Sequence, residues 1–267
     1  MLLTVFVSCI ALGAVVGYLA GLLGIGGGLV IVPALVHLLP LLGIDQAIIM
    51  PMALATSLST IVITSTTAAF AHHKNGNIPW PLTKELIGFI AVGALLGAFI
   101  ADNLSAKSLA LIFSCAVIAL ALYMLRSIRK SKVKPIPSVA ILRTIGLITG
   151  SLASLMGISG GAILIPTLTY FGLQLRHTIG VATACGMVVA FFGSIGYVIT
   201  GWHEQHIPDW SLGYIYLPAL LGIVSSSSLF ARMGVRQAKK LPVTTLKKMF
   251  AVFLIIVALK MIFSEVL

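Results

Sequence analysis

Long apolar runs, separated only by short polar segments, are the feature that most constrains how this chain can fold. Only 9% of its 267 residues are charged and 59% are hydrophobic. A water-soluble domain carries about 25% charged residues, so this chain lacks the polar surface that a soluble globule needs. The apolar runs are also continuous, whereas the strands of a transmembrane barrel alternate apolar and polar positions. The sequence therefore predicts an all-α polytopic membrane protein that has membrane lipid as a partner.

The net charge of +11 is concentrated in two segments between apolar runs. One extends from Arg126 to Arg143 and the other from Arg232 to Lys248. Basic loops between apolar spans are typical of the cytoplasmic side of a membrane protein. No nucleic-acid-binding module carries this charge, so we expect no nucleic-acid partner.

Two halves of the chain repeat each other. The segment GIGGGLVIVPAL (24–35) is matched 133 residues later by GISGGAILIPTL (157–168). Further pairs follow in the same order: ATSLST and ATACGM, then NIPW and HIPDW. Such self-similarity predicts an internal duplication. We expect repeat 1 at residues 1–126, a basic cytoplasmic linker at 127–143 and repeat 2 at 144–267, all within one membrane domain.

Each repeat is expected to hold one interrupted apolar segment and three continuous transmembrane helices. The interrupted segments cover residues 3–42 and 144–172. The limbs Thr144–Met156 and Ala162–Gly172 would be roughly 17–20 Å long as helices, too short to cross a core of ~30 Å. A segment that enters and returns also keeps both basic loops on one side. We therefore expect a glycine-tipped hairpin of discontinuous helices in each repeat, two inverted repeats, and both termini outside.

The glycines at the two tips are the candidate substrate-binding residues. A helix N-terminus presents unpaired N–H groups with partial positive charge, and glycine lets an anion approach them closely. The expected cradle consists of Gly24, Gly26, Gly27, Gly28, Gly157, Ser159, Gly160 and Gly161. The side chains expected to line it are Thr56, Ser57, Thr183 and Cys185. Alternatively, the glycines serve only close helix packing. The hydroxyls could likewise serve only to hydrogen-bond backbone carbonyls of their own helix.

Enzymatic machinery is not expected. The three cysteines have no metal or redox spacing, and the six histidines form no metal-binding motif. We therefore expect no cofactor and no metal site. The six carboxylates fall in polar segments or at the ends of apolar ones. This position disfavours a proton relay within the membrane.

At these residues the chain resembles the TauE/SafE sulfite exporter family, also called the toluene-sulfonate uptake permease family. The resemblance rests on the two glycine motifs, on Pro33 and Pro166, and on Thr56 and Thr183 in the paired AT signatures. It extends over essentially the whole chain. It implies a secondary transporter of the bacterial inner membrane that exports a small sulfur-containing anion, sulfite or an organosulfonate. An anion channel and an accessory membrane subunit without transport activity are the alternatives.

Overall fold

The computed structural model describes residues 2–23, 27–126, 135, 137–204, 206–238 and 243–265. These residues are almost entirely helical, which confirms the expected all-α fold. The helices are α1 (Leu2–Leu23), α2 (Gly28–Leu38), α3 (Gln46–Lys74), α4 (Trp80–Asp102), α5 (Ala106–Arg126), α6 (Val139–Leu155), α7 (Gly161–Tyr170), α8 (Leu175–Thr200), α9 (Leu217–Ala238) and α10 (Val243–Glu265). Short 3-10 helices, η1 (Leu39–Leu42) and η2 (Gly201–His203), and a two-stranded hairpin, β1 (Ser211–Leu212) and β2 (Ile215–Tyr216), connect them.

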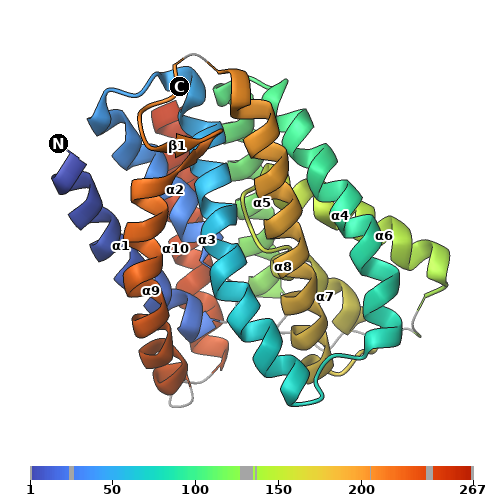
Figure 1. Cartoon of the computed structure of the whole chain (residues 1–267). Helices are drawn as coiled ribbons and strands as arrows, with labels where there is room; N and C mark the ends of the chain where they lie inside the picture. The colour runs from blue at the N-terminus through green and yellow to red at the C-terminus, as the bar shows by residue number, and fades with distance from the viewer. Residues whose placement is uncertain are drawn as a thin grey trace.

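Long apolar helices show that the protein is integral to a membrane. Within the described ranges, α3, α4, the Ala106–Tyr123 part of α5, and α8 extended to His203 are each long and apolar enough to cross a bilayer. Figure 1 shows α3, α5 and α9 running from the upper to the lower end of the bundle, and α4, α8 and α10 running back. The strand hairpin and the α4–α5 connection lie at the upper end, and the α3–α4 connection lies at the lower end.

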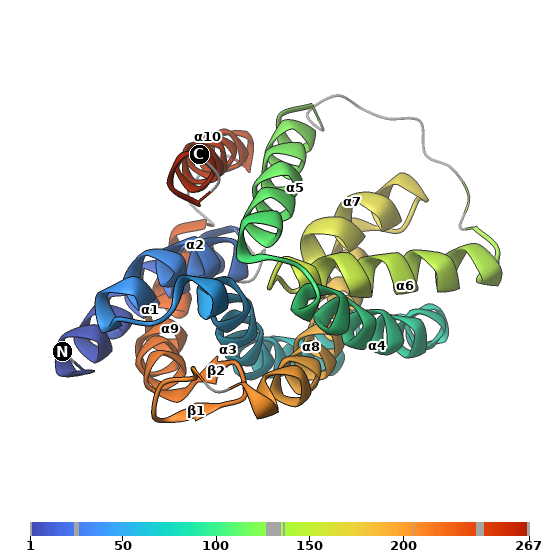
Figure 2. The ribbon, with the colours of Figure 1, turned by 90° about the horizontal axis from the view of Figure 1, so that it is seen from above.

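Helices α3 and α8 cross at the centre of the bundle in opposite directions (Figure 2). The Ser59 hydroxyl on α3 donates to the Ser194 hydroxyl on α8 at 3.1 Å. At the lower end, the backbone of Asn77 packs on Gly180, near the start of α8. Both contacts are between residues far apart in sequence, so this crossing joins the two halves of the chain.

Each half also packs one helix on the other half through glycines. Gly13 and Gly17 of α1 lie against Ile223 and Ser227 of α9, with no room for a side chain. Figure 2 shows this pair on one side of the bundle and the pair α4 and α6 on the other.

The α4–α6 pair is built in the same way. Gly150 of α6 lies against Ile90 of α4, and Gly93 of α4 lies against Leu147 of α6. Small residues allow helix backbones to approach closely in membranes, where packing and not water exclusion drives association. Gly13, Gly17, Gly93 and Gly150 therefore have a packing role.

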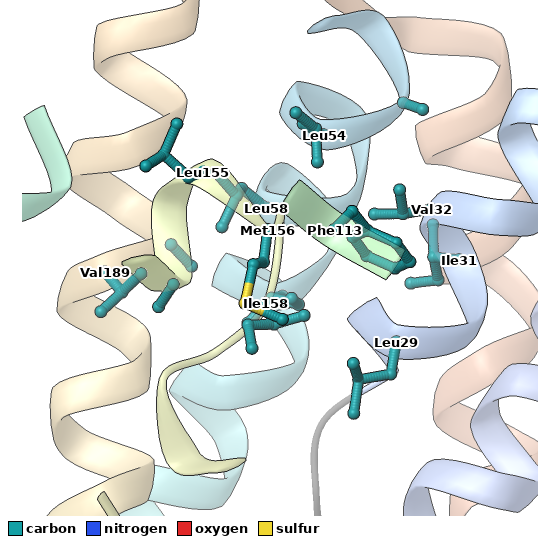
Figure 3. Packing of buried hydrophobic residues seen from close by; sticks show 14 of the residues in the cluster. Leu29, Ile31, Val32, Leu54, Leu58, Phe113, Leu155, Met156, Ile158 and Val189 are labelled. Carbon is teal, nitrogen blue, oxygen red and sulfur yellow. The ribbon is translucent and has the colours of Figure 1, made fainter. Parts of the chain in front are cut away.

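The hydrophobic core surrounds the α6–α7 loop and the start of α2. Figure 3 shows Leu54 and Leu58 of α3, with Met156 and Ile158 of the loop on one side and residues of α2 on the other. Phe113 of α5 lies beside α2 in the same view and is fully buried. The two short helices α2 and α7 therefore begin inside the protein.

The first limb of each interrupted segment is longer than expected. Helix α1 has 22 residues and α6 has 17, about 33 Å and 25 Å at 1.5 Å per residue. Helix α1 is therefore long enough to cross a core of ~30 Å, and the expectation of a half-helix is wrong for this limb. Helix α6 is longer than the expected limb but shorter than that core, and the short second limbs are confirmed by α2 and α7. Helix α6 starts at Val139, inside the expected linker, because an apolar turn follows Pro137 and because Arg143 forms an ion pair of 3.0 Å with Glu85 of α4.

Candidate functional site

Two glycines with left-handed backbones build the loop between α6 and α7. Gly157 has a φ of 61° and Gly160 a φ of 68°, a conformation that favours glycine. Gly157 ends α6 in a Schellman motif. In this motif the Ile158 N–H donates to the Ala153 carbonyl at 2.9 Å, and the Gly157 N–H donates to the Ser154 carbonyl at 3.1 Å. Gly160 is the N-cap of α7. The chain can therefore end one helix and start the next within a short turn.

Both short helices have a glycine as the N-cap residue. Gly27 precedes α2 and Gly160 precedes α7, and neither N-cap position makes a side-chain hydrogen bond to its helix. The first N–H groups of a helix have no partners within it and carry partial positive charge. Leu29 and Ala162, in the first turns of α2 and α7, are both buried. A small anion is a suitable partner for N–H groups in such a position.

The start of α2 lies directly against the α6–α7 loop. A Cβ atom on Gly28 would stand 2.5 Å from the Gly157 carbonyl oxygen and 3.1 Å from the Ile158 Cα atom. The Ser57 hydroxyl on α3 donates to the same Gly157 carbonyl at 2.7 Å. Three of the expected site residues, from three separate parts of the chain, are therefore in contact.

The far side of the loop lies against α8. The Ser159 carbonyl packs on Gly186 without room for a side chain at that position. Gly161 has more space, since a Cβ atom there would lie 3.9 Å from the Ala182 Cβ atom. Cys185 is fully buried beside Gly186 on the same helix. Ser159, Gly161 and Cys185 therefore share one neighbourhood, opposite the contact with α2.

Close packing also explains part of the glycine motif. A side chain on Gly27 would collide with Val16 of α1, and one on Gly28 would collide with the α6–α7 loop. Among the tip glycines, Gly161 combines a right-handed backbone with free space for a methyl group. Gly24 and Gly26 lie outside the described residues.

The expected hydroxyls have different environments. The Thr56 hydroxyl is fully buried and accepts the backbone N–H of Tyr216 at 3.0 Å. The Thr183 hydroxyl donates to the Ile179 carbonyl of its own helix at 2.7 Å, which is the alternative role considered for it. Thr183 is partly exposed. The two threonines of the AT signatures therefore occupy unequal positions.

Several residues near the loop were not expected from the sequence. Ser154 is fully buried, and its hydroxyl has no hydrogen-bond partner among the residues that the structure describes. The Tyr197 hydroxyl donates to the Ser154 carbonyl at 3.4 Å, and Ser194 bonds Ser59. A polar residue within an apolar run was the available signal for Ser154 and Ser194. For Tyr216 there was no signal, because strands of two residues leave no period in the sequence.

Three of the carboxylates lie at the ends of long helices. Asp45 caps the start of α3, Asp102 ends α4, and Glu85 pairs with Arg143 at the other end of α4. Within the described ranges, no three His, Cys, Asp or Glu side chains lie close enough to hold a metal ion. The positive ends of α2 and α7 therefore have no carboxylate from these residues beside them.

Comparisons with known proteins agree with the membrane fold. A family model described as "Sulfite exporter TauE/SafE" matches residues 9–261. A probable membrane transporter protein of Haemophilus influenzae is 42% identical over 97% of this chain and 98% of its own length. One from Methanocaldococcus jannaschii is 28% identical over 95% of this chain and 94% of its own length. No solved structure matches the chain. The chain therefore belongs to the TauE/SafE sulfite exporter family and is a membrane transporter, not an enzyme.

Proposed function

We propose that this protein is a secondary transporter that exports a small sulfur-containing anion, sulfite or an organosulfonate, across the bacterial inner membrane. The observation that carries this proposal is the contact, inside the bundle, between the start of α2 and the α6–α7 loop, which leads directly into the start of α7. The family to which the chain belongs is described as a sulfite exporter family, which supports the substrate class.

The proposed site lies between the start of α7, the start of α2 and the crossing of α3 with α8. Backbone N–H groups at the two helix starts would bind the anion, helped by the partial charge of each helix. The Ser159 Oγ atom lies at the start of α7, 3.6 Å from where a Cβ atom on Gly161 would stand, and is a candidate donor to the anion. The buried Ser154 hydroxyl faces Gly193 of α8 and is a candidate donor on that side. Such a site suits an oxyanion because it offers several donors and no negative charge.

Two inverted repeats, 1–126 and 144–267, are the proposed architecture around this site. The glycines at positions 13 and 17 correspond to those at 146 and 150, with the offset of 133 residues seen in the tip motifs. Helix α1 packs on α9 as α6 packs on α4, and the related helices α3 and α8 run in opposite directions. This supports a pseudo-twofold axis in the membrane plane, with the substrate at the interface of the repeats.

The lower end in Figure 1 is proposed to be cytoplasmic. Arg126 ends α5 there, and Arg143 lies near the start of α6 beside Glu85, which is in the first turns of α4. Residues 126–134, with Arg126 included, carry five Lys and Arg side chains. Positively charged loops are retained on the cytoplasmic side during insertion.

The test is anion flux in proteoliposomes that contain the purified protein. Sulfite and methanesulfonate are offered, with sulfate as a comparison, under a potassium–valinomycin potential as the only driving force. We expect saturable, electrogenic flux of sulfite or the sulfonate, because moving one negative charge outward gains about 2.3 kcal/mol per 100 mV. Flux without saturation would favour an anion channel. Folded protein without flux or binding of any of these anions would favour an accessory subunit.

A further inference from the structure

The β1–β2 hairpin covers the outer side of the proposed site. It reaches down from the upper end and ends at Tyr216, whose backbone N–H donates to the Thr56 hydroxyl at 3.0 Å. Thr56 and Tyr216 are both buried. The hairpin therefore occupies a hydroxyl on α3 that neighbours Ser57, which in turn bonds the α6–α7 loop.

The hairpin is built as one unit that rests on the end of α8. Its two-residue turn is Gly213–Tyr214, and Gly213 has a φ of 54°, as the tight hairpin turns require. Gly213 packs on the Val198 backbone of α8, and Gly201 packs under the Tyr214 backbone. The Leu217 N–H donates to the Trp210 carbonyl at 3.1 Å and closes the base of the unit.

A side-chain hydrogen bond holds the turn of the hairpin to α4. The Tyr214 hydroxyl donates to the Asp102 carboxylate at 3.1 Å. Burial, and then the negative charge of Asp102, raise the pKa of Tyr214, so the hydroxyl remains protonated and able to donate. The Tyr214 ring also contacts the ring of Tyr197, whose hydroxyl bonds the end of α6 next to the loop.

A cavity opens beside this hydrogen bond. It has a volume of about 520 Å³ and lies between the start of α3, the α4–α5 connection and the segment before the hairpin. Its lining includes Asp45, Asp102, Lys107, Glu204, His206 and Tyr214. The cavity therefore leads from the upper surface to the turn of the hairpin and ends there.

We propose that this cavity is the outer mouth of the anion pathway and that the β1–β2 hairpin is its gate, fastened by the Tyr214–Asp102 hydrogen bond. The inference rests on the proposed function, since it assumes an anion site below the hairpin. Thr183, the counterpart of Thr56 in the second AT signature, is partly exposed. Thr56, by contrast, is covered by the hairpin through its hydrogen bond with Tyr216, so the gate is closed in this structure. When the hairpin lifts, Thr56 loses its Tyr216 partner and the site communicates with the mouth.

The first test fastens the gate covalently. In a Cys115→Ser background, which removes the exposed cysteine, Asp102→Cys with Tyr214→Cys is bridged by a short bifunctional methanethiosulfonate reagent. We expect the bridge to stop sulfite flux in proteoliposomes and a reductant to restore it. The matched control is Glu85→Cys with Arg143→Cys, which replaces the ion pair between α4 and α6 at the opposite end of α4. Its bridge should leave flux unchanged.

The second test does not depend on flux. Buried Cys185 serves as the reporter of outer access, and its labelling by a membrane-impermeant maleimide added outside is measured in the Cys115→Ser background. Tyr214→Phe removes the fastening hydroxyl and should raise the labelling rate about tenfold, the effect of one hydrogen bond to a charged group. Tyr123→Phe, on the exposed side of α5, should not change it.

These results separate the gate from the transport function. A bridged Asp102→Cys/Tyr214→Cys protein that still carries sulfite would overturn the gate. Equal labelling of Cys185 in Tyr214→Phe and in its parent would also overturn it, whether or not anions are carried. Increased labelling in a protein that carries and binds none of the anions would support the gate and contradict the proposed function.

Discussion

Gly160 and Gly161 are adjacent but have different physical roles. Gly160 has a positive φ, whereas Gly161 is the first residue of α7 and has space for a methyl group. A side chain on Gly160 strains the backbone by about 1–2 kcal/mol. A methyl group on Gly161 causes no such strain and stands at the helix start where the anion is proposed to bind. Variants of these two residues therefore distinguish an effect on the stability of the loop from an effect on anion binding.

Gly161→Ala should leave the protein folded and weaken sulfite binding about tenfold or more, because a blocked N–H group loses a hydrogen bond to a charged ligand worth roughly 1.5–3 kcal/mol. Gly160→Ala should lower the thermal stability as well. Binding is measured by calorimetry on the purified protein and stability by thermal unfolding. Unchanged sulfite affinity in Gly161→Ala would show that the backbone at Gly161 does not bind the anion.

Ser154 gives a second test at this scale. Its hydroxyl is buried and has no partner within the described part of the chain, and a buried polar group without a hydrogen bond costs roughly 1–3 kcal/mol. Ser154→Ala should therefore not lower thermal stability and should weaken sulfite binding. Ser57→Ala is the comparison, because it removes the donor to the Gly157 carbonyl and should destabilise the loop. If Ser154→Ala binds sulfite normally, Ser154 is not part of the anion site.

At the scale of elements, helix packing depends on glycines at the α1–α9 and α4–α6 contacts. Gly17 of α1 meets the backbone of Ser227, which cannot move away as a flexible side chain could. Gly150 of α6 meets the backbone of Ile90 in the same manner. Overpacked positions of this kind cost typically 1–3 kcal/mol and more where backbones must separate.

Gly17→Val and Gly150→Val should each lower the amount of folded protein in the membrane and its resistance to thermal aggregation in detergent. Gly88→Ala on α4 is the control, since nothing lies within 4 Å of a Cβ atom there. It should be neutral or stabilise the helix by up to ~1 kcal/mol. The readout is the fraction of protein that stays monodisperse after heating. Equal behaviour of the valine and alanine variants would contradict a packing role.

The sequence predicts best the helices and loops that are set by residues close together in the chain. The glycine pairs and the repeated order of landmarks were enough to expect the loop of Gly157 and Gly160 and the short helices α2 and α7. The length of α6 was missed because Arg143 looks like a loop residue until its partner Glu85 is known. The β1–β2 hairpin and the unequal positions of Thr56 and Thr183 depend on contacts between distant parts of the chain.

At the scale of the whole molecule, the charges divide between the two ends. Three acidic side chains, Asp45, Asp102 and Glu204, and one basic side chain, Lys107, line the cavity at the upper end, while Arg126 borders the expected linker and Arg143 is its last residue. With the basic end in the cytoplasm, anions meet positive charge where export begins and negative charge where it ends. The acidic mouth should therefore disfavour re-entry of an anion, through repulsion that salt screens.

This orientation predicts that both termini are outside. A reporter that is active only in the cytoplasm should be silent when fused after Leu267 and active when fused after Arg236. The physical reason is retention of the basic segments on the cytoplasmic side. Membrane-normalised reporter activity is the measurement. An active fusion after Leu267 would contradict the inverted arrangement of the repeats.

The exchange of helices between the two halves has a consequence for biosynthesis. Helix α1 leaves the ribosome first, but the surface on which its glycines pack belongs to α9, about 200 residues later in the chain. At 5–20 residues per second, α1 waits roughly 10–40 s for its partner. Throughout this time the face of α1 that packs on α9 can be covered only by lipid or by the insertion machinery. The last part of the chain to be made therefore decides whether the first part is ever correctly folded.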